Sequence, residues 1–226
     1  MVRRSLLYSI KEQTMEITGA IFDFDGTIFD SMHIWQGIKF QFFERVGLVL
    51  TKEEKEEFKG LFLLEAIQLA NERYNLGMSD KELFNEFFTL IKEKYLLDTE
   101  PKNDIIEFLE KLKNKGVKIG IATATGEIAL IPALEKFNML HYFEEIYSTY
   151  TVGASKTEPK VYDVVLNELG TEKETTWIFE DALYAAKTAK KAGYNVVGIY
   201  DKSESEQEEL KNLVDIYIHN YSELDI

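Results

Sequence analysis

The sequence contains no cysteine, and this absence removes several kinds of site at once. Without a thiol, the chain forms no disulfide bonds, has no thiolate nucleophile, and binds neither zinc nor iron–sulfur clusters through cysteine. Histidine is nearly as scarce, with three residues in 226. None of the three lies in the close helical pair that zinc hydrolases use. Oxygen atoms are therefore the expected ligands of any metal in this protein.

Long hydrophobic runs and an excess of basic residues are also missing. No apolar run approaches the roughly 18 residues that a membrane span needs, so we expect no membrane segment. The 40 acidic residues outnumber the 26 basic ones and leave a formal charge of −14 at pH 7. A net anion of this size is repelled by the phosphate backbone of nucleic acids. We therefore expect a cytoplasmic enzyme that binds neither nucleic acid nor membranes.

What the sequence does contain is an alternation of short apolar segments and amphipathic helices. Helical patterns such as residues 104–115 and 159–169 lie between most of the apolar segments. Strands that alternate with helices pair in parallel through crossover connections. We therefore predict an α/β fold with a Rossmann-like open parallel sheet flanked by helices. The segments that predict buried strands are residues 17–22, 117–122, 145–147, 177–179, 196–199 and 215–218.

One block interrupts this alternation directly after the first strand. From about residue 31 to residue 97 the sequence shows only helical patterns, at residues 34–46, 51–58, 61–75 and 79–97. We therefore predict an inserted all-helical cap domain at residues 30–98, and a core formed by residues 15–29 and 99–226. The two short connections suit a lid that hinges on the core. We expect residues 1–14 to be a disordered tail.

An aromatic-rich stripe runs along the last of these helical patterns. Its apolar residues recur with helical spacing, so we expect them to form the core of the insertion and not a ligand site. The stripe consists of Phe84, Phe87, Phe88, Ile91 and Tyr95.

Polar residues follow four of the predicted strands, either directly or in the next loop. They are Asp23 and Asp25 after the first, Thr123 after the second, Lys156 in the loop after the third, and Glu180 and Asp181 after the fourth. Taken alone, each has an ordinary explanation, such as a turn, a helix cap or a solvated lysine. In open parallel sheets, however, ligands bind beyond the carboxyl ends of the strands. Because all these residues should meet at that edge, together they predict a catalytic site.

These residues resemble the four motifs of the haloacid dehalogenase-like hydrolase superfamily. The motifs here are Asp23-Phe24-Asp25-Gly26-Thr27, Thr123, Lys156 with Pro159 three residues on, and Glu180-Asp181. The helical block after the first strand is similar to the cap of the phosphatase and phosphomutase branch of that superfamily. The resemblance covers nearly the whole chain, from Met15 to Leu224. It implies a phosphoaspartyl intermediate and a requirement for Mg²⁺.

The residue types fit the roles that the resemblance implies. Asp23 would attack phosphorus, while Asp25, two residues on, would protonate the leaving oxygen and later activate water. Oxygen ligands suit Mg²⁺ better than zinc, and the expected ligands are Asp23, the backbone carbonyl of Asp25, Glu180 and Asp181. Phosphoryl oxygens would be bound by Thr123, the backbone amide of Ala124, and Lys156. The expected catalytic residues are Asp23, Asp25, Thr123 and Lys156.

We predict hydrolysis of a small phosphorylated metabolite, such as a sugar monophosphate, and keep two alternatives open. A β-phosphoglucomutase-like isomerase would carry a histidine and an arginine where this chain has Trp35 and Leu63. A non-catalytic binding protein is at odds with the intact set of catalytic residue types. Dehalogenation is disfavoured because the dehalogenases lack the second aspartate, here Asp25. Substrate choice is expected to depend on four residues of the insertion, His33, Trp35, Lys59 and Leu63.

Overall fold

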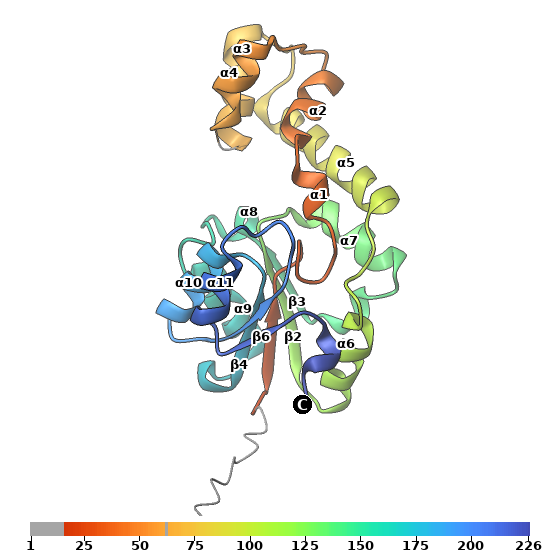
Figure 1. The fold of residues 1–226 in the computed structure, drawn as a ribbon. Coiled ribbons are helices and arrows are strands. Elements are labelled where there is room, and N and C mark those ends of the chain that lie inside the picture. Colours follow the sequence, from red (N-terminus) through yellow and green to blue (C-terminus); the bar gives the residue numbers. More distant parts are fainter. Residues whose placement is uncertain (1–15, 62) are drawn as a thin grey trace, which may run out of the picture.

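The centre of the molecule is one parallel sheet of six strands in the order β3-β2-β1-β4-β5-β6 (Figure 1). The computed structural model describes residues 16–61 and 63–226, so the tail predicted at residues 1–14 lies outside the described residues. The strands are β1 (Gly19–Phe22), β2 (Lys118–Thr123), β3 (Glu145–Ser148), β4 (Thr176–Glu180), β5 (Asn195–Ile199) and β6 (Ile216–Ile218). The predicted α/β fold is confirmed, and every predicted strand is present within two residues of its expected bounds.

Helices cover both faces of the sheet. Successive residues of a strand point to opposite faces, so one strand contributes side chains to both of the hydrophobic clusters. Ala20 and Phe22 of β1 belong to the hydrophobic cluster that includes α6 (Ile105–Asn114) and α7 (Glu127–Lys136). The residue between them, Ile21, belongs to a second cluster on the other face. That cluster is built with α9 (Lys160–Leu169), α10 (Leu183–Lys191) and α11 (Gln207–Leu213). The central strand is therefore buried on both sides, as its apolar sequence requires.

The helical insertion, residues 30–98, contains no strand among its described residues. Its helices are α1 (Met32–Trp35), α2 (Ile38–Arg45), α3 (Lys52–Lys59), α4 (Leu63–Tyr74) and α5 (Asp80–Asp98). The single helix predicted at residues 34–46 is divided in two. The reason is Gly37, whose φ of 73° is left-handed and ends one helical segment before the next begins.

The two connections of the insertion lie side by side beyond the carboxyl end of β1. The backbone N–H of Asp30 donates to the carbonyl of Glu100 at 3.0 Å, and that of Lys102 donates to the carbonyl of Ile28 at 2.8 Å. α5 also packs along α7, where Lys136 Nζ donates to the carbonyl of Leu96 at 3.0 Å. The insertion is therefore fixed to the sheet domain along α5, while α2, α3 and α4 lie farther from the sheet (Figure 1).

The aromatic stripe of α5 does more than fill the insertion. Phe87 and Ile91 are fully buried in its core, as predicted. Phe88, in contrast, meets the ring of Tyr150 in α8 (Thr149–Val152) edge-on, with ring centres 5.1 Å apart. Tyr95 is also buried, but its hydroxyl reaches the loop after β1. The expectation that the whole stripe serves only the insertion is therefore wrong, because α5 faces the insertion and the sheet domain at once.

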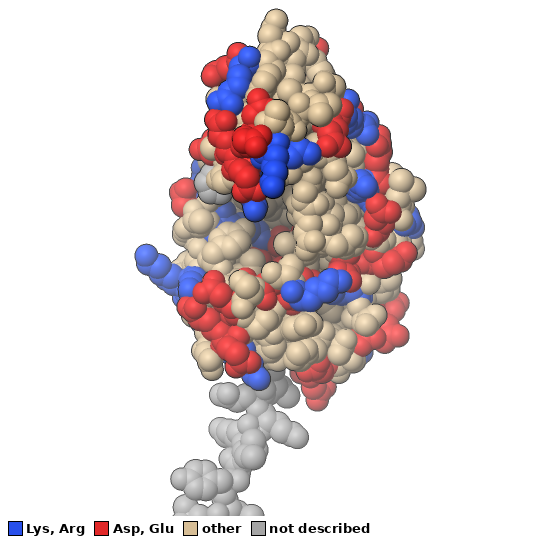
Figure 2. Space-filling model, turned by 45° about the horizontal axis from the view of Figure 1, so that its top comes forward, with Lys and Arg blue, Asp and Glu red and all other residues tan. Residues whose placement is uncertain are grey.

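The surface carries the charge that the composition predicts. On the face shown in Figure 2, Lys and Arg side chains are interspersed among acidic ones and form no continuous basic stripe. A hollow opens on this face between the helical insertion and the sheet domain (Figure 2). Among the described residues, no helix has both the length and the apolar composition that crossing a bilayer requires.

Candidate active site

Side chains from three separate parts of the chain meet at the carboxyl edge of the sheet. Lys156, in the loop before α9, lies with its Nζ 2.6 Å from Oδ1 of Asp23 and 2.7 Å from Oε2 of Glu180. Asp23 follows β1, and Glu180 is the last residue of the neighbouring strand β4. The Lys156 and Glu180 side chains are fully enclosed, whereas that of Asp23 keeps 12% of its surface exposed. The convergence that the sequence predicts for these residues is present in the structure.

The carboxylates of this cluster outnumber its cation. Asp23, Glu180 and Asp181 offer oxygen atoms that all lie within 4.8 Å of one another. Burial raises the pKa of Asp23 to about 7, although the nearby Lys156 ammonium acts in the opposite direction. Burial, followed by repulsion from Glu180 and Asp23, raises the pKa of Asp181 well above its ordinary value. Burial lowers the pKa of Lys156, but the charges of Asp23 and Glu180 outweigh it and keep that ammonium protonated.

This donor set fits a hard divalent cation. Three crowded carboxylates with one lysine leave uncompensated negative charge, and a bound cation would relieve it. The ligand atoms are all oxygens, which Mg²⁺ prefers, and the cluster contains neither a histidine nor a thiol to favour zinc. Among the described residues, Asp23, Glu180 and Asp181 can therefore hold Mg²⁺.

Gly26 brings the loop after β1 against the loop after β4. Its φ of 75° is left-handed, and a Cβ built on it would lie 2.2 Å from Oδ2 of Asp181. The next residue, Thr27, donates its hydroxyl to Oδ1 of Asp181 at 2.9 Å. Only glycine allows this turn and this close approach together. The pair Gly26-Thr27 thus fixes the Asp181 carboxylate in the cluster.

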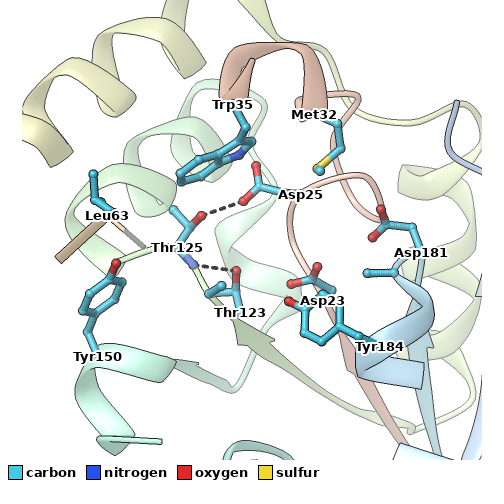
Figure 3. Close-up of a pocket in the computed structure, with 12 residues that line it drawn as sticks. Asp23, Asp25, Met32, Trp35, Leu63, Thr123, Thr125, Tyr150, Asp181 and Tyr184 are labelled. Carbon is cyan, nitrogen blue, oxygen red and sulfur yellow. Dashed lines mark hydrogen bonds between the residues drawn. The ribbon is translucent and has the colours of Figure 1, made fainter. Parts of the chain in front are cut away.

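The Asp25 side chain lies outside the carboxylate cluster. Its Oδ1 accepts hydrogen bonds from Ser31 Oγ and Tyr95 OH, each at 2.6 Å. Its Oδ2 accepts from Thr125 Oγ1 at 2.6 Å (Figure 3). Burial, followed by the charge of Asp23, raises the pKa of Asp25, and the three hydroxyls act in the opposite direction. The Asp25 carboxyl group is therefore surrounded by hydroxyl donors, whereas Asp23 and Glu180 contact the Lys156 ammonium. Ligation through its backbone carbonyl, which the sequence predicts, stays a prediction.

The end of β2 faces the same space. Thr123 Oγ1 accepts a hydrogen bond from the backbone N–H of Thr125 at 3.1 Å, so its own hydroxyl proton is available to a ligand (Figure 3). Ala124, whose backbone amide is a predicted phosphate donor, also lines this space. A tetrahedral oxyanion placed here would meet these donors from the end of β2.

Residues of the insertion and of the sheet domain together line a cavity of about 260 Å³. Two of the four residues predicted to select the substrate, Trp35 and Leu63, line it, whereas His33 and Lys59 do not. His33 is exposed and lies 3.0 Å from the carbonyl of Asp98, and the Lys59 side chain is 71% exposed. The expectation that His33 and Lys59 face the substrate is therefore not met, because both side chains point to solvent. The described residues that line the cavity are Asp23, Asp25, Met32, Trp35, Leu63, Thr123, Ala124, Thr125, Tyr150, Asp181, Ala182 and Tyr184.

Several site residues could not be identified from sequence patterns. Ser31 and Tyr95 come from the insertion, and Thr125, Tyr150 and Tyr184 come from the sheet domain. The only available signal was proximity in sequence to a motif, for Ser31, Thr125 and Tyr184. Tyr95 carried none, since it belongs to an ordinary apolar helical pattern, and Tyr150 stands in no pattern that the sequence analysis identifies.

An open parallel sheet with this cluster at its carboxyl edge defines a class of hydrolases. The haloacid dehalogenase-like hydrolase family matches residues 20–199, and the chain belongs to that family. It is an enzyme of the phosphatase-like branch, as the resemblance in its motifs predicted.

Curated relatives support this placement, and a solved structure shares the fold. The chain is 26% identical over 184 residues to the phosphorylated carbohydrates phosphatase of Thermotoga maritima. The matched region covers 76% of this chain and 80% of that protein. It is 24% identical over 217 residues to hexitol phosphatase B of Escherichia coli, covering 92% and 95%. The crystal structure of CbbY from Rhodobacter sphaeroides in complex with phosphate superposes with a TM-score of 0.75, at 19% identity, over 92% of this chain and 96% of that one. The last likeness establishes the fold alone.

Proposed function

We propose that this enzyme is a Mg²⁺-dependent phosphatase that hydrolyses a small phosphorylated metabolite through a phosphoaspartyl intermediate on Asp23. The observation that carries the proposal is the contact of Lys156 with both Asp23 and Glu180 inside a buried, oxygen-rich cluster. A phosphate monoester is anionic, so an aspartate can attack it only where positive charge offsets the repulsion. This cluster contains one lysine and a set of carboxylates suited to a cation.

In the first step, Asp23 is the nucleophile. Its Oδ1 is held 2.6 Å from Lys156, which leaves Oδ2 to attack phosphorus. The hydroxyl of Thr123 and the backbone amide of Ala124 bind phosphoryl oxygens from the β2 side. When bound by Asp23, Glu180 and Asp181, Mg²⁺ supplies charge that neutralises the phosphoryl oxygens.

Asp25 is the general acid and base of the proposal. Burial raises the pKa of Asp25, and the carboxyl group in its protonated form gives its proton to the leaving oxygen as the P–O bond breaks. In the second step the same carboxylate takes a proton from water, which then hydrolyses the acyl phosphate and releases inorganic phosphate. Ser31, Tyr95 and Thr125 orient the Asp25 side chain in both steps.

We also propose that residues 30–98 act as a cap that closes the site from solvent. The proposal is supported by Trp35 and Leu63, which belong to the insertion and line the cavity opposite residues of the sheet domain. A cytoplasmic location and a small-molecule partner are part of the same proposal.

The test is Mg²⁺-dependent release of phosphate from 4-nitrophenyl phosphate. Wild type should release phosphate, chelation should stop the release, and Asp23→Asn should lower kcat by about 10³-fold or more. Asp225→Asn is a matched control, because Asp225 is exposed near the end of the chain. Equal rates for wild type and Asp23→Asn would refute the proposal. A hexose 1-phosphate offered with its bisphosphate tests for the mutase, which would return an isomerised sugar phosphate.

A further inference from the structure

The part of the cavity away from the carboxylates is built from uncharged and largely apolar side chains. Met32 and Trp35 come from α1, Leu63 begins α4, and Tyr150 comes from α8 (Figure 3). The Tyr150 ring also contacts Phe88 edge-on, with ring centres 5.1 Å apart. Once the phosphoryl group is bound at Asp23, the rest of the substrate must occupy the space between these side chains.

This space offers no positive charge to a second anionic group. None of the described residues that line the cavity is lysine, arginine or histidine. In the nearby part of the insertion, Lys39 Nζ is already bonded to the carbonyls of Phe58 at 2.9 Å and Leu61 at 2.5 Å. The charged groups that do line the cavity are the carboxyl groups of Asp23, Asp25 and Asp181. A carboxylate or second phosphate on the substrate would lose its hydration without gaining a counter-charge.

Trp35 adds an N–H donor to these walls. Its Nε1 is buried and has no hydrogen-bond partner among the described residues. The indole packs against Phe87, with ring centres 6.4 Å apart. A buried N–H without a partner costs free energy, and a substrate oxygen that accepts from it would recover that cost. The flat indole also suits the apolar face of a ring.

The cavity is small. Its volume of about 260 Å³ is slightly below the roughly 300 to 1,000 Å³ of typical ligand pockets. We propose that the preferred substrate is the phosphate monoester of a small, uncharged ring alcohol, such as a sugar or cyclic polyol. Its ring lies against Trp35 and Leu63, and one of its oxygens accepts a hydrogen bond from Trp35 Nε1. This inference rests on the phosphatase function proposed above.

The first experiment compares kcat/KM for matched phosphate esters under Mg²⁺. A hexose 6-phosphate has an uncharged leaving group, whereas the hexose 1,6-bisphosphate and phosphoglycolate each carry a second anionic group. We expect the hexose 6-phosphate to be preferred by about 10-fold or more over both. If either anionic ester has an equal or higher kcat/KM, the substrate inference is overturned while the phosphatase stands. If no ester is hydrolysed, or Asp23→Asn is as active as wild type, the proposed function itself has failed.

Two variants test the walls directly. Trp35→Phe keeps a ring but removes the donor, so the ratio of kcat/KM for hexose 6-phosphate to that for phenyl phosphate should fall by about 3- to 10-fold. Its control is Trp177→Phe, because Trp177 lies on β4 and donates to the carbonyl of Glu16. Leu63→Arg places a cation in the cavity and should raise the ratio for phosphoglycolate over hexose 6-phosphate by about 10-fold.

Leu64→Arg is the control for Leu63→Arg, since Leu64 is the next residue of α4, is 44% exposed, and does not line the cavity. Unchanged ratios in both Trp35→Phe and Leu63→Arg would show that these side chains do not contact the leaving group. That result would overturn the inference, whatever the absolute activity of the variants. Because each readout is a ratio of two substrates on one protein, partial misfolding does not produce the expected result.

Discussion

Tyr95 donates its phenolic hydrogen to Oδ1 of Asp25 across a distance of 2.6 Å, although 70 residues separate the two in sequence. Tyr95 belongs to α5 of the insertion, and Asp25 belongs to the loop after β1. Burial raises the pKa of Tyr95 well above its ordinary value, so the hydroxyl stays protonated and remains a donor. The insertion thus helps to position the side chain that we propose as general acid and base.

Tyr95→Phe removes this donor and leaves the ring in place. We expect kcat/KM for 4-nitrophenyl phosphate to fall by about 10-fold, because a hydrogen bond to a carboxyl group contributes about 1.5 kcal/mol or more. Phosphate release measured at saturating Mg²⁺ checks the effect. Tyr142→Phe is the control, since Tyr142 lies in the short helix before β3 and not in the cavity. Equal losses in both variants would contradict a positioning role for Tyr95.

Gly26→Ala should damage both stability and activity. A left-handed residue other than glycine costs about 1–2 kcal/mol, and here the added Cβ would also meet Oδ2 of Asp181 at 2.2 Å. Gly170→Ala separates the two effects, because Gly170 has a φ of 64° but no atom within 4 Å of the place that a Cβ would take. Urea unfolding should show a loss in both variants. Phosphate release should fall only in Gly26→Ala, and wild-type activity there would contradict the role given to Gly26.

Mg²⁺ should raise the thermal midpoint of unfolding, independently of any assay of activity. A ligand at 100 times its Kd stabilises a protein by about 2.7 kcal/mol, which is about 5–10 °C for a chain of this size. Asp181→Asn removes one of the three carboxylates and should lose most of this shift, whereas Asp225→Asn should keep it. Calorimetry with NaCl at matched ionic strength separates binding from screening. A full shift in Asp181→Asn would count against this ligand set.

The contact of Lys102 with Asp201 should make stability depend on pH. Their atoms Nζ and Oδ2 lie 2.6 Å apart, and the Asp201 side chain is 2% exposed. Burial would raise the pKa of Asp201, but hydrogen bonds from Lys102 and Ser203 outweigh it and hold that pKa below its ordinary value. A depressed carboxyl pKa stabilises the fold above the unfolded pKa of about 3.9, and the gain is lost as the pH falls through the folded pKa.

Lys102→Met tests this dependence. It should lower the free energy of unfolding by about 2 kcal/mol at pH 7, because the buried Asp201 carboxylate loses its charged partner. The deficit relative to wild type should shrink below about pH 4, where the carboxyl group becomes protonated in both proteins. Urea unfolding at pH 7, 5, 4 and 3 measures it. Lys115→Met, at an exposed position after α6, serves as the control. A deficit that is constant across this range would refute the assignment.

The sequence alone was enough to bring the motif residues to one edge of the sheet. Because β1, β2 and β4 are parallel neighbours, whatever follows each strand must lie at the same edge, and this brings Asp23, Thr123 and Glu180 together. The residues of the insertion that line the cavity were harder to predict from the sequence. Trp35 and Leu63 line the cavity, but His33 and Lys59, chosen by the same reasoning, face solvent. Sequence position within a helical insertion does not fix which side of a short helix faces the core.

The alternation of strands and helices, the carboxylates that follow the strands and the absence of thiol ligands are matters of local pattern and composition, which the sequence by itself determines. The path of α5 was decided only by tertiary packing. Its apolar stripe predicts burial, yet burial against the insertion and burial against α7 satisfy the same periodicity. Only the folded structure shows that the hydroxyl of Tyr95 donates a hydrogen bond to Asp25 of the sheet domain. A hydrogen bond between residues so far apart in sequence leaves no local signature, because it depends on how two separately folded elements dock.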